Sequence, residues 1–196
     1  MFRIMGRRKD HSREELLEMS ITAGKQLVSE GGASALTARN VASKIGYTAG
    51  TLYNVFENLQ GLATAINTAV LMDFGNTVDS IVKTKSTASD CVSAICQAYL
   101  DFQSKEPKLW ALAFASGQVG EGIDYSNAVH RIFDPLADAL FAISGDTELA
   151  RKDAKVVWCT LHGICLLRQN GKLAVTKDDT SEVLVERFLQ QFLKAK

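Results

Sequence analysis

Proline and long apolar runs are both scarce in this sequence. Only two prolines, Pro107 and Pro135, occur among 196 residues. Because proline removes a backbone donor and clashes with the preceding helical turn, its scarcity permits long helices along most of the chain. The apolar runs are short, as at residues 109–115, and fall well below the ~18 residues that a membrane span needs. No charged start followed by an apolar core and a cleavage site is visible either. We therefore expect a cytoplasmic protein with no membrane partner.

Residues arranged for catalysis or metal binding are also missing. None of the three histidines, His11, His130 and His162, stands beside a serine or cysteine in a nucleophile-like turn, and no glycine-rich phosphate loop is present. Cys159, His162 and Cys165 are spaced three apart on one expected helix, but their directions spread over about 120°, so a metal would need ligands from elsewhere. The alternative is that these cysteines are small buried hydrophobic residues. The sequence therefore indicates no enzyme, no cofactor and no metal.

Neither sign of charge dominates, because 22 Lys and Arg residues balance 22 Asp and Glu residues. Zero net charge looks unfavourable for a nucleic-acid partner, but affinity for phosphate depends on the local patch rather than on the sum. The basic residues that could form such a patch are Arg3, Arg7, Arg8, Lys9, Arg13, Arg39 and Lys44. The N-terminal ones among them either contact phosphate or form a solvated tail.

Residues 36–62 have the pattern of two short helices joined by a tight turn and followed by a longer helix. Thr37 and Thr48 can each cap a helix with the side-chain hydroxyl, and Gly46 suits the left-handed end of the first helix. Inward-facing positions recur at helical spacing, at Val41, Ala42, Ile45, Leu52, Val55 and Phe56. The outward face of the second helix holds Ala49, Gly50, Thr51, Tyr53 and Asn54. This is the layout of a helix-turn-helix, which places its second helix in the major groove of DNA.

Helical periodicity continues along the rest of the chain without a strand pattern. We expect helices over residues 12–30, 59–83, 87–104, 125–143, 148–170 and 180–194, and another that begins at Pro107. Ser12 and Glu15 have the spacing of a capping box, and glycines at 117, 120 and 122 indicate a loop. The expected fold class is all-α, with a three-helix DNA-binding domain over residues 1–58 and an antiparallel helical bundle over residues 59–196, about nine helices in total. A continuous helix from Leu59 would connect the two domains rigidly.

The run GTLYNVFENLQGL resembles the signature of the TetR (tetracycline-repressor) family of bacterial transcriptional regulators. The matching positions are Leu36, Thr37, Arg39, Val41 and Ala42 upstream, then Gly50, Thr51, Leu52, Tyr53 and Phe56. Further along, Trp158, His162 and Gly163 resemble the Trp-x-x-x-His-Gly pattern of one class within that family. The resemblance implies a homodimeric repressor that binds a palindromic operator in double-stranded DNA and is released by a small-molecule effector. A twofold dimer would place its two helix-turn-helix units about 34–36 Å apart along the DNA, or a multiple of that distance.

The residues assigned to DNA contact are Thr37, Arg39, Thr48, Ala49, Thr51, Tyr53 and Asn54. Two positions depart from the family. Ala49 replaces a commonly longer polar residue, so DNA shape would contribute more to recognition. Leu59 stands where the family often carries a lysine that binds phosphate, so we expect weaker binding and a flatter dependence on salt.

Apolar side chains on the later helices predict an effector pocket, with His162 as a polar group. The candidates are Met72, Phe74, Phe102, Trp110, Phe114, Phe133, Trp158 and His162. The alternative is that these side chains fill the core and leave no cavity. Apolar stripes on the last two helices predict a four-helix dimer contact, unless the last helix packs only on its own chain. Its candidates are Leu161, Cys165, Leu166, Val185, Phe188, Leu189 and Phe192, with Trp158 beside them.

Two other classes of function stay open at this point. A helical interaction or scaffolding module with a degenerate DNA-binding head would share the same composition. A small helical enzyme is the third class, although no arrangement of site residues supports it. Salt-sensitive binding to a specific duplex distinguishes the regulator from both.

Overall fold

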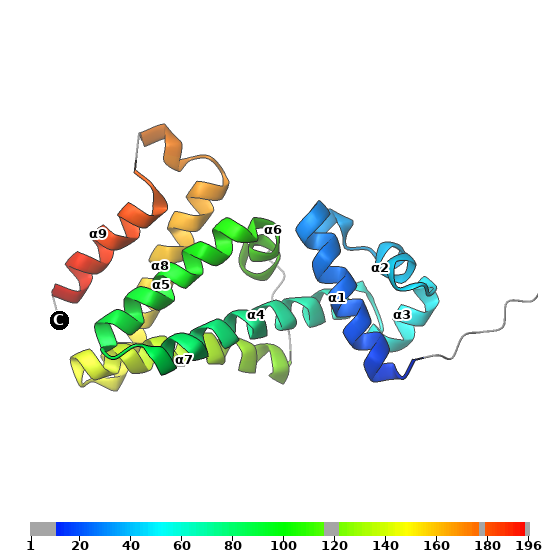
Figure 1. Ribbon diagram of the computed structural model, residues 1–196, viewed down its shortest axis with the longest axis horizontal. Coiled ribbons are helices and arrows are strands. Elements are labelled where there is room, and N and C mark those ends of the chain that lie inside the picture. Colours follow the sequence, from blue (N-terminus) through cyan, green and yellow to red (C-terminus); the bar gives the residue numbers. More distant parts are fainter. Residues whose placement is uncertain (1–10, 116–121, 177–178, 195–196) are drawn as a thin grey trace, which may run out of the picture. The chain divides into compact units, whose positions relative to one another are not determined.

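The computed structural model describes residues 11–115, 122–176 and 179–194, and the regular elements within these ranges are all helices. This confirms the all-α prediction (Figure 1). The longer helices are α1 (Arg13–Gly31), α2 (Ala38–Ile45), α3 (Ala49–Phe56), α4 (Leu59–Thr84), α5 (Ala88–Lys105), α7 (Ile123–Ser144), α8 (Thr147–Gln169) and α9 (Ser181–Lys194). The four-residue α6 (Pro107–Trp110) continues into a π-helical turn at Ala111–Ala115, and short 3-10 turns occupy Ala33–Ala35 and Leu173–Thr176.

The helices begin where the sequence places capping side chains. At α1 the Ser12 hydroxyl accepts from the Glu15 backbone N–H at 3.1 Å, and a Glu15 carboxylate oxygen accepts from the Ser12 N–H at 2.6 Å. The capping box predicted there is therefore present. Thr87 caps α5 in the same way, since its hydroxyl accepts from the Asp90 N–H at 3.1 Å. Of the predicted loop glycines, only Gly122 lies within the described residues, where it precedes α7.

The chain divides into two compact units, Met1–Ile66 and Asn67–Lys196. The division falls after the second turn of α4 rather than at residue 58, because the beginning of α4 packs with the first three helices. Ile66 is fully buried, and a Cβ atom placed on Gly24 of α1 would lie 2.2 Å from its Cδ1 atom. Gly24 therefore leaves the space that Ile66 occupies. As a result, α4 contributes its first two turns to one unit and the rest to the other.

The second unit has its own hydrophobic core. α7 packs against α5 and α8, and α9 packs against the same two helices. Trp110 is fully buried there, together with Val78, Leu100 and Val157. Burial of side chains of this size contributes roughly 1.5–3 kcal/mol each to folding. Within the described ranges, no helix combines the length and hydrophobicity needed to cross a membrane.

A tight joint links α3 to α4. Glu57 adopts a positive φ of 62°, and the Asn58 side-chain oxygen then accepts from the Gly61 backbone N–H at 2.8 Å. A Cβ atom at Gly61 would lie 2.3 Å from the carbonyl oxygen of Phe56. Because a backbone carbonyl cannot rotate away as a flexible side chain can, this joint requires glycine at position 61.

We expect Gly61→Ala to destabilise the protein by about 1–3 kcal/mol, because the added methyl group overlaps a backbone atom. Thermal unfolding followed by circular dichroism measures the change. Gly50→Ala is the matched control: its Cβ would have the Thr48 Oγ1 atom at 3.8 Å as its nearest neighbour, so the melting temperature should stay the same or rise. Equal melting temperatures for the two variants would contradict the close approach at Gly61.

Candidate DNA-contacting surface and ligand cavity

The helix-turn-helix predicted from the sequence is present as α2, a turn at Gly46, and α3. Gly46 adopts the left-handed conformation, with φ of 77°, and its N–H bonds back to the carbonyls of α2. The Thr37 hydroxyl caps α2 by accepting from the Asn40 N–H at 3.1 Å. The Thr48 hydroxyl caps α3 by accepting from the Thr51 N–H at 3.4 Å. The turn and both caps therefore fix where α3 begins.

α3 separates an inward from an outward face. Leu52, Val55 and Phe56 are buried, as their spacing predicted. On the opposite face Tyr53 is 47% exposed, and Gly50 and Asn54 are exposed. The first residues of the helix follow the same division, with Thr48 exposed and Ala49 and Thr51 half-buried. An outward face of small residues and one tyrosine allows the helix backbone to approach another surface closely.

The capping hydroxyls on this surface still have a proton to donate. A threonine hydroxyl that accepts a backbone N–H keeps its own O–H, which can bond to a phosphate oxygen. The Thr48 and Thr51 hydroxyls also lie 3.1 Å apart, so the two groups hold each other in place. Thr37 is half-buried and Arg39 is exposed at the start of α2. One of the Thr48 and Thr51 hydroxyls donates to the other, so at least one of the two protons stays available for a partner at the N-terminal end of α3.

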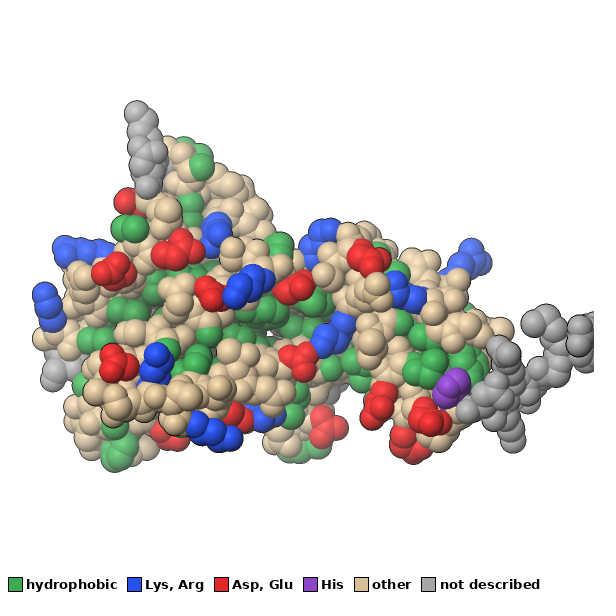
Figure 2. All heavy atoms as spheres, viewed as in Figure 1, with side chains coloured by type: hydrophobic (Ala, Val, Ile, Leu, Met, Phe, Trp, Pro, Cys, Tyr) green, Lys and Arg blue, Asp and Glu red, His purple; other side chains and the backbone are tan. Residues whose placement is uncertain are grey.

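Charge on the first unit is used partly for structure. The Arg13 guanidinium donates to the Val55 carbonyl at 3.0 Å, near the last turn of α3, where a cation stabilises the helix dipole. Arg3, Arg7, Arg8 and Lys9 lie outside the described residues. On the face drawn in Figure 2, basic and acidic side chains are interspersed, in line with the zero net charge of the chain.

Tyr47 is a residue of this surface that the sequence reasoning missed. Its hydroxyl lies 2.7 Å from the Nδ1 atom of His11, and the two rings meet edge to face with centroids 6.0 Å apart. The contact ties the segment that precedes α1 to the turn between α2 and α3. The sequence alone gave no signal for it, because residues 36 positions apart meet only in the folded unit.

The second unit contains an apolar cavity of about 340 Å³. That volume lies at the lower end of the range for small-molecule sites. Its walls come from α4, α5, the π-helical turn, α7 and α8. The lining residues are Leu71, Phe74, Ile95, Tyr99, Phe114, Tyr125, Val129, Ile132, Phe133, Leu136, Trp158 and Leu161.

Four of the eight residues predicted for an effector pocket line this cavity, namely Phe74, Phe114, Phe133 and Trp158. The other four lie behind or beside the wall. Met72 is exposed, Phe102 stacks on Phe74 with centroids 5.6 Å apart, and Trp110 is fully buried. His162 is half-buried and contacts the wall through Tyr99. The missed residues belong mostly to α5 and α7, whose apolar faces gave no sign of which side chains border a space.

A cluster of polar groups adjoins one part of the cavity wall. The Tyr99 hydroxyl lies 3.2 Å from His162 Nδ1, and His162 stacks on Trp110 with ring centroids 5.3 Å apart. Burial lowers the pKa of His162 and raises that of Tyr99, so both groups are neutral near pH 7. The cluster therefore adds hydrogen-bonding groups to the wall without adding charge.

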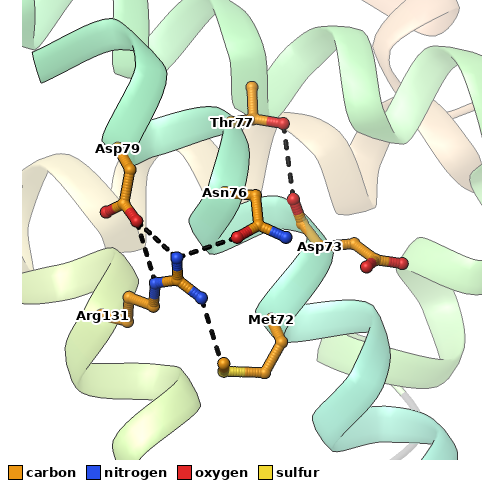
Figure 3. Close-up of polar contacts among 6 residues, drawn as sticks. All are labelled: Met72, Asp73, Asn76, Thr77, Asp79 and Arg131. Atoms are coloured by element: carbon orange, nitrogen blue, oxygen red, sulfur yellow. Dashed lines mark hydrogen bonds and ion pairs between the residues drawn. The ribbon is translucent and has the colours of Figure 1, made fainter. Parts of the chain in front are cut away.

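An arginine clasp joins α7 to α4 beside the cavity (Figure 3). Arg131 donates from Nε to the Asp79 carboxylate at 3.0 Å and from Nη2 to the Asn76 side-chain oxygen at 2.8 Å. Its stem passes over Gly75, where a Cβ atom would lie 3.1 Å from the Arg131 Cδ. The neighbours of these residues on the two helices, Phe74 and Ile132 among them, line the cavity. The clasp therefore links two of the helices that contribute to the wall.

Most residues predicted for a dimer contact are used within the chain. Leu161, Cys165, Val185 and Leu189 are buried in the core of the second unit. Phe188 and Phe192 are partly buried against that core, with ring centroids 5.2 Å apart, and Leu166 is 38% exposed. A different stripe of α8 is open: it holds Leu149, Val156, Gly163 and Leu167. The first four side chains therefore have little exposed surface in the single chain, whereas the open stripe is accessible.

The cysteines do not assemble into a metal site in the part of the chain that the structure describes. No group of three or more His, Cys, Asp or Glu side chains there could hold an ion. Cys159 is exposed, while Cys165 is buried and its thiol has a pKa raised to about 12 by desolvation. A thiol with such a pKa stays protonated near pH 7 and is a poor metal ligand.

Two family models match this chain. The model described as bacterial regulatory proteins, tetR family, matches residues 21–66, which contain the helix-turn-helix. The model described as tetracyclin repressor-like, C-terminal domain, matches residues 92–192, which include α7, α8 and most of α5 and α9.

Known proteins resemble the chain over most of its length. It is 24% identical over 179 residues to an uncharacterised helix-turn-helix transcriptional regulator of Mycobacterium tuberculosis, covering 91% of this chain and 79% of that protein. A TetR transcriptional regulator from Rhodococcus sp. RHA1 shares the fold with a TM-score of 0.67, 18% identity, and coverage of 93% and 98%. FadR from Bacillus subtilis, solved with stearoyl-CoA, gives a TM-score of 0.64, 16% identity, and coverage of 91% and 98%.

Proposed function

This chain belongs to the TetR family of bacterial transcriptional regulators, and we propose that it is a homodimeric repressor released from its operator by a small, largely apolar effector. The observation that carries the proposal is the combination of two sites in one chain. One is an outward-facing, doubly capped helix-turn-helix, and the other is an uncharged cavity of about 340 Å³. The helix α4 contributes residues to both units that hold these sites.

DNA contact is assigned to the outward face of α3 and the N-terminal ends of α2 and α3. Tyr53 and Asn54 are exposed on α3, and Thr48 presents a hydroxyl at its first turn. Thr37 and Arg39 are placed to bind phosphate at the start of α2. Because Ala49 offers no polar group, recognition would depend on DNA shape in addition to base contacts.

A second copy of the chain is the partner that the open stripe of α8 supports. Leu149, Val156 and Gly163 are spaced seven residues apart and so lie on one side of the helix. A Cβ atom at Gly163 would meet nothing within 4 Å, so another helix could approach closely at that point. Pairing α8 and α9 with their copies would bury Val156 and Leu167, which are 48% and 45% exposed in the single chain.

The arginine clasp offers a route from the cavity to α4. A ligand that fills the space between α4 and α7 favours a wider separation of these helices, which opposes the Arg131–Asp79 contact. Coupling free energies of this kind are typically ~1–3 kcal/mol. We assign the clasped arrangement to the state that binds DNA, and effector binding would reduce its population.

Leu59→Lys tests DNA binding by the helix-turn-helix. Leu59 is 41% exposed at the first position of α4, so a lysine there would add one phosphate contact without disturbing the core. We expect tighter operator binding and a salt slope steeper by about one unit, measured by fluorescence anisotropy over a range of salt concentrations. Val82→Lys adds the same charge at an exposed site near the other end of α4 and should change neither quantity. If both variants match the wild type, α4 does not begin beside phosphate.

Val156→Glu combined with Leu167→Glu tests the dimer. Both side chains are exposed in the single chain, so the charges should leave folding intact while repelling each other across a twofold contact. Sedimentation velocity should show a dimer for the wild type and a monomer for the double variant. Val82→Glu places a charge at an equally exposed valine on another helix and should remain dimeric. A double variant that stays dimeric would place the contact elsewhere.

Arg131→Met tests the clasp. Methionine retains a stem over Gly75 and removes the charge that holds Asp79. We expect operator affinity to fall about fivefold in the absence of any effector, at the low end of typical coupling because the pair is partly exposed. Arg151→Met breaks an ion pair of 3.4 Å that joins α8 to Asp134 of α7 without involving α4, so its affinity should not change. Unchanged affinity in a folded Arg131→Met protein would show that the clasp does not favour the DNA-binding state.

A further inference from the structure

Among the described residues that line the cavity, none carries a charge. None of its twelve lining residues is Lys, Arg, His, Asp or Glu. An ionised ligand would lose its hydration on entry and find no counter-ion, which is strongly unfavourable. The polar atoms that the lining side chains offer are the hydroxyls of Tyr99 and Tyr125 and the indole N–H of Trp158. The wall therefore selects against both carboxylates and amines.

Tyr99 differs from Tyr125 because its hydroxyl is held in place. Tyr99 is 3% exposed, and its oxygen lies 3.2 Å from His162 Nδ1. Burial raises the pKa of Tyr99, and the nearby indoles of Trp110 and Trp158 oppose this shift to a smaller extent. A hydroxyl fixed in this way loses little freedom when a ligand binds, which favours a specific hydrogen bond over a loose contact.

Donors outnumber acceptors in this cluster. The Trp110 indole N–H is fully buried, and among the described residues no acceptor lies in hydrogen-bonding geometry to it. Trp158 and Tyr99 contribute two further donors, whereas the acceptors are one nitrogen of neutral His162 and the Tyr99 oxygen. Tyr99 and Trp158 line the cavity, so a ligand oxygen beside them can accept a hydrogen bond that a hydrocarbon of the same size cannot form.

We propose that the cavity binds an uncharged, largely apolar molecule with a single oxygen function, a hydroxyl or a carbonyl, and that Tyr99 is the residue that recognises this oxygen. His162 acts as a positioning residue, because it orients the Tyr99 hydroxyl and does not itself line the cavity. The apolar remainder of the ligand lies against the aromatic rings of Phe74, Phe114 and Phe133. This inference rests on the proposed effector role of the cavity and specifies the class of effector.

Three probes of similar shape test the inference: 4-propylphenol, propylbenzene and 4-propylbenzoate, each titrated into the full chain by calorimetry at pH 7.5. We expect the phenol to bind about tenfold more tightly than the hydrocarbon, which corresponds to one good neutral hydrogen bond, and the benzoate not to bind. Tyr99→Phe should abolish the preference for the phenol while leaving the affinity for propylbenzene unchanged. His162→Phe, which can keep the stack on Trp110, should reduce the same preference.

Tyr125→Phe is the matched control, because it removes the other tyrosine hydroxyl of the wall and should keep the tenfold preference. The inference is overturned if Tyr99→Phe retains the preference, if the benzoate binds most tightly, or if none of the probes binds. Release of labelled operator DNA by each probe separates this inference from the effector role. A Tyr99-dependent preference without release supports the ligand class and contradicts the effector role, whereas equal release by phenol and hydrocarbon supports the effector role and contradicts the ligand class.

Discussion

The packing of Ile66 against Gly24 is the contact that joins α4 to the first unit. Ile66 is fully buried in the space that a side chain on α1 would otherwise fill. The contact commits the first turns of α4 to the DNA-binding unit, and the tight joint at Gly61 fixes where that helix begins. Farther along the same helix, Leu71 and Phe74 line the cavity, and Asp79 holds Arg131 of α7. A single helix therefore contributes residues to both units, which is the physical basis that we propose for coupling the two sites.

Charge is distributed so that each site can work in a chain of zero net charge. On the helix-turn-helix, the exposed groups are mostly neutral hydroxyls and backbone donors at helix N-termini. Arg13 donates to the Val55 carbonyl and stabilises the end of α3. Inside the bundle, Tyr99 and His162 are both neutral because burial disfavours their charged forms. Neutral donors can bind a phosphate oxygen at the helix-turn-helix and a ligand oxygen in the cavity without a large desolvation cost.

The clasp between Arg131 and α4 is suited to a regulator because it is only partly buried. Arg131 and Asp79 are 32% and 35% exposed, so water can replace their contact at moderate cost. A fully buried ion pair would be much harder to break, since each separated charge would lose its partner in a medium of low polarity. Gly75 allows the arginine stem to lie close to α4, so the clasp holds the helices together without a bulky side chain between them. An effector of moderate affinity could then shift the balance between two arrangements.

The helix-turn-helix could be predicted from the sequence because the residues that fix it lie close together in the chain. Thr37, Gly46 and Thr48 fix two helix starts and one turn through contacts with residues three or four positions away. Leu52, Val55 and Phe56 define the inward face of α3 by their spacing alone. The same local rules gave the capping box at Ser12 and the helical character of the remaining chain. None of these features depends on how one helix crosses another.

The cavity and the open stripe of α8 were decided only by tertiary structure. Spacing identified Leu161 and Cys165 as apolar positions of α8, but it could not show that they face the core while Val156 and Leu167 remain exposed. Nor could it show that Tyr99, rather than His162, reaches the cavity wall. A helical pattern specifies which residues share a face, and long-range packing specifies what that face meets. The sequence by itself therefore determined the helices, the turn and the outward surface of α3. The placement of five distant segments around one space, and the clasp beside it, came from contacts between residues far apart in the chain.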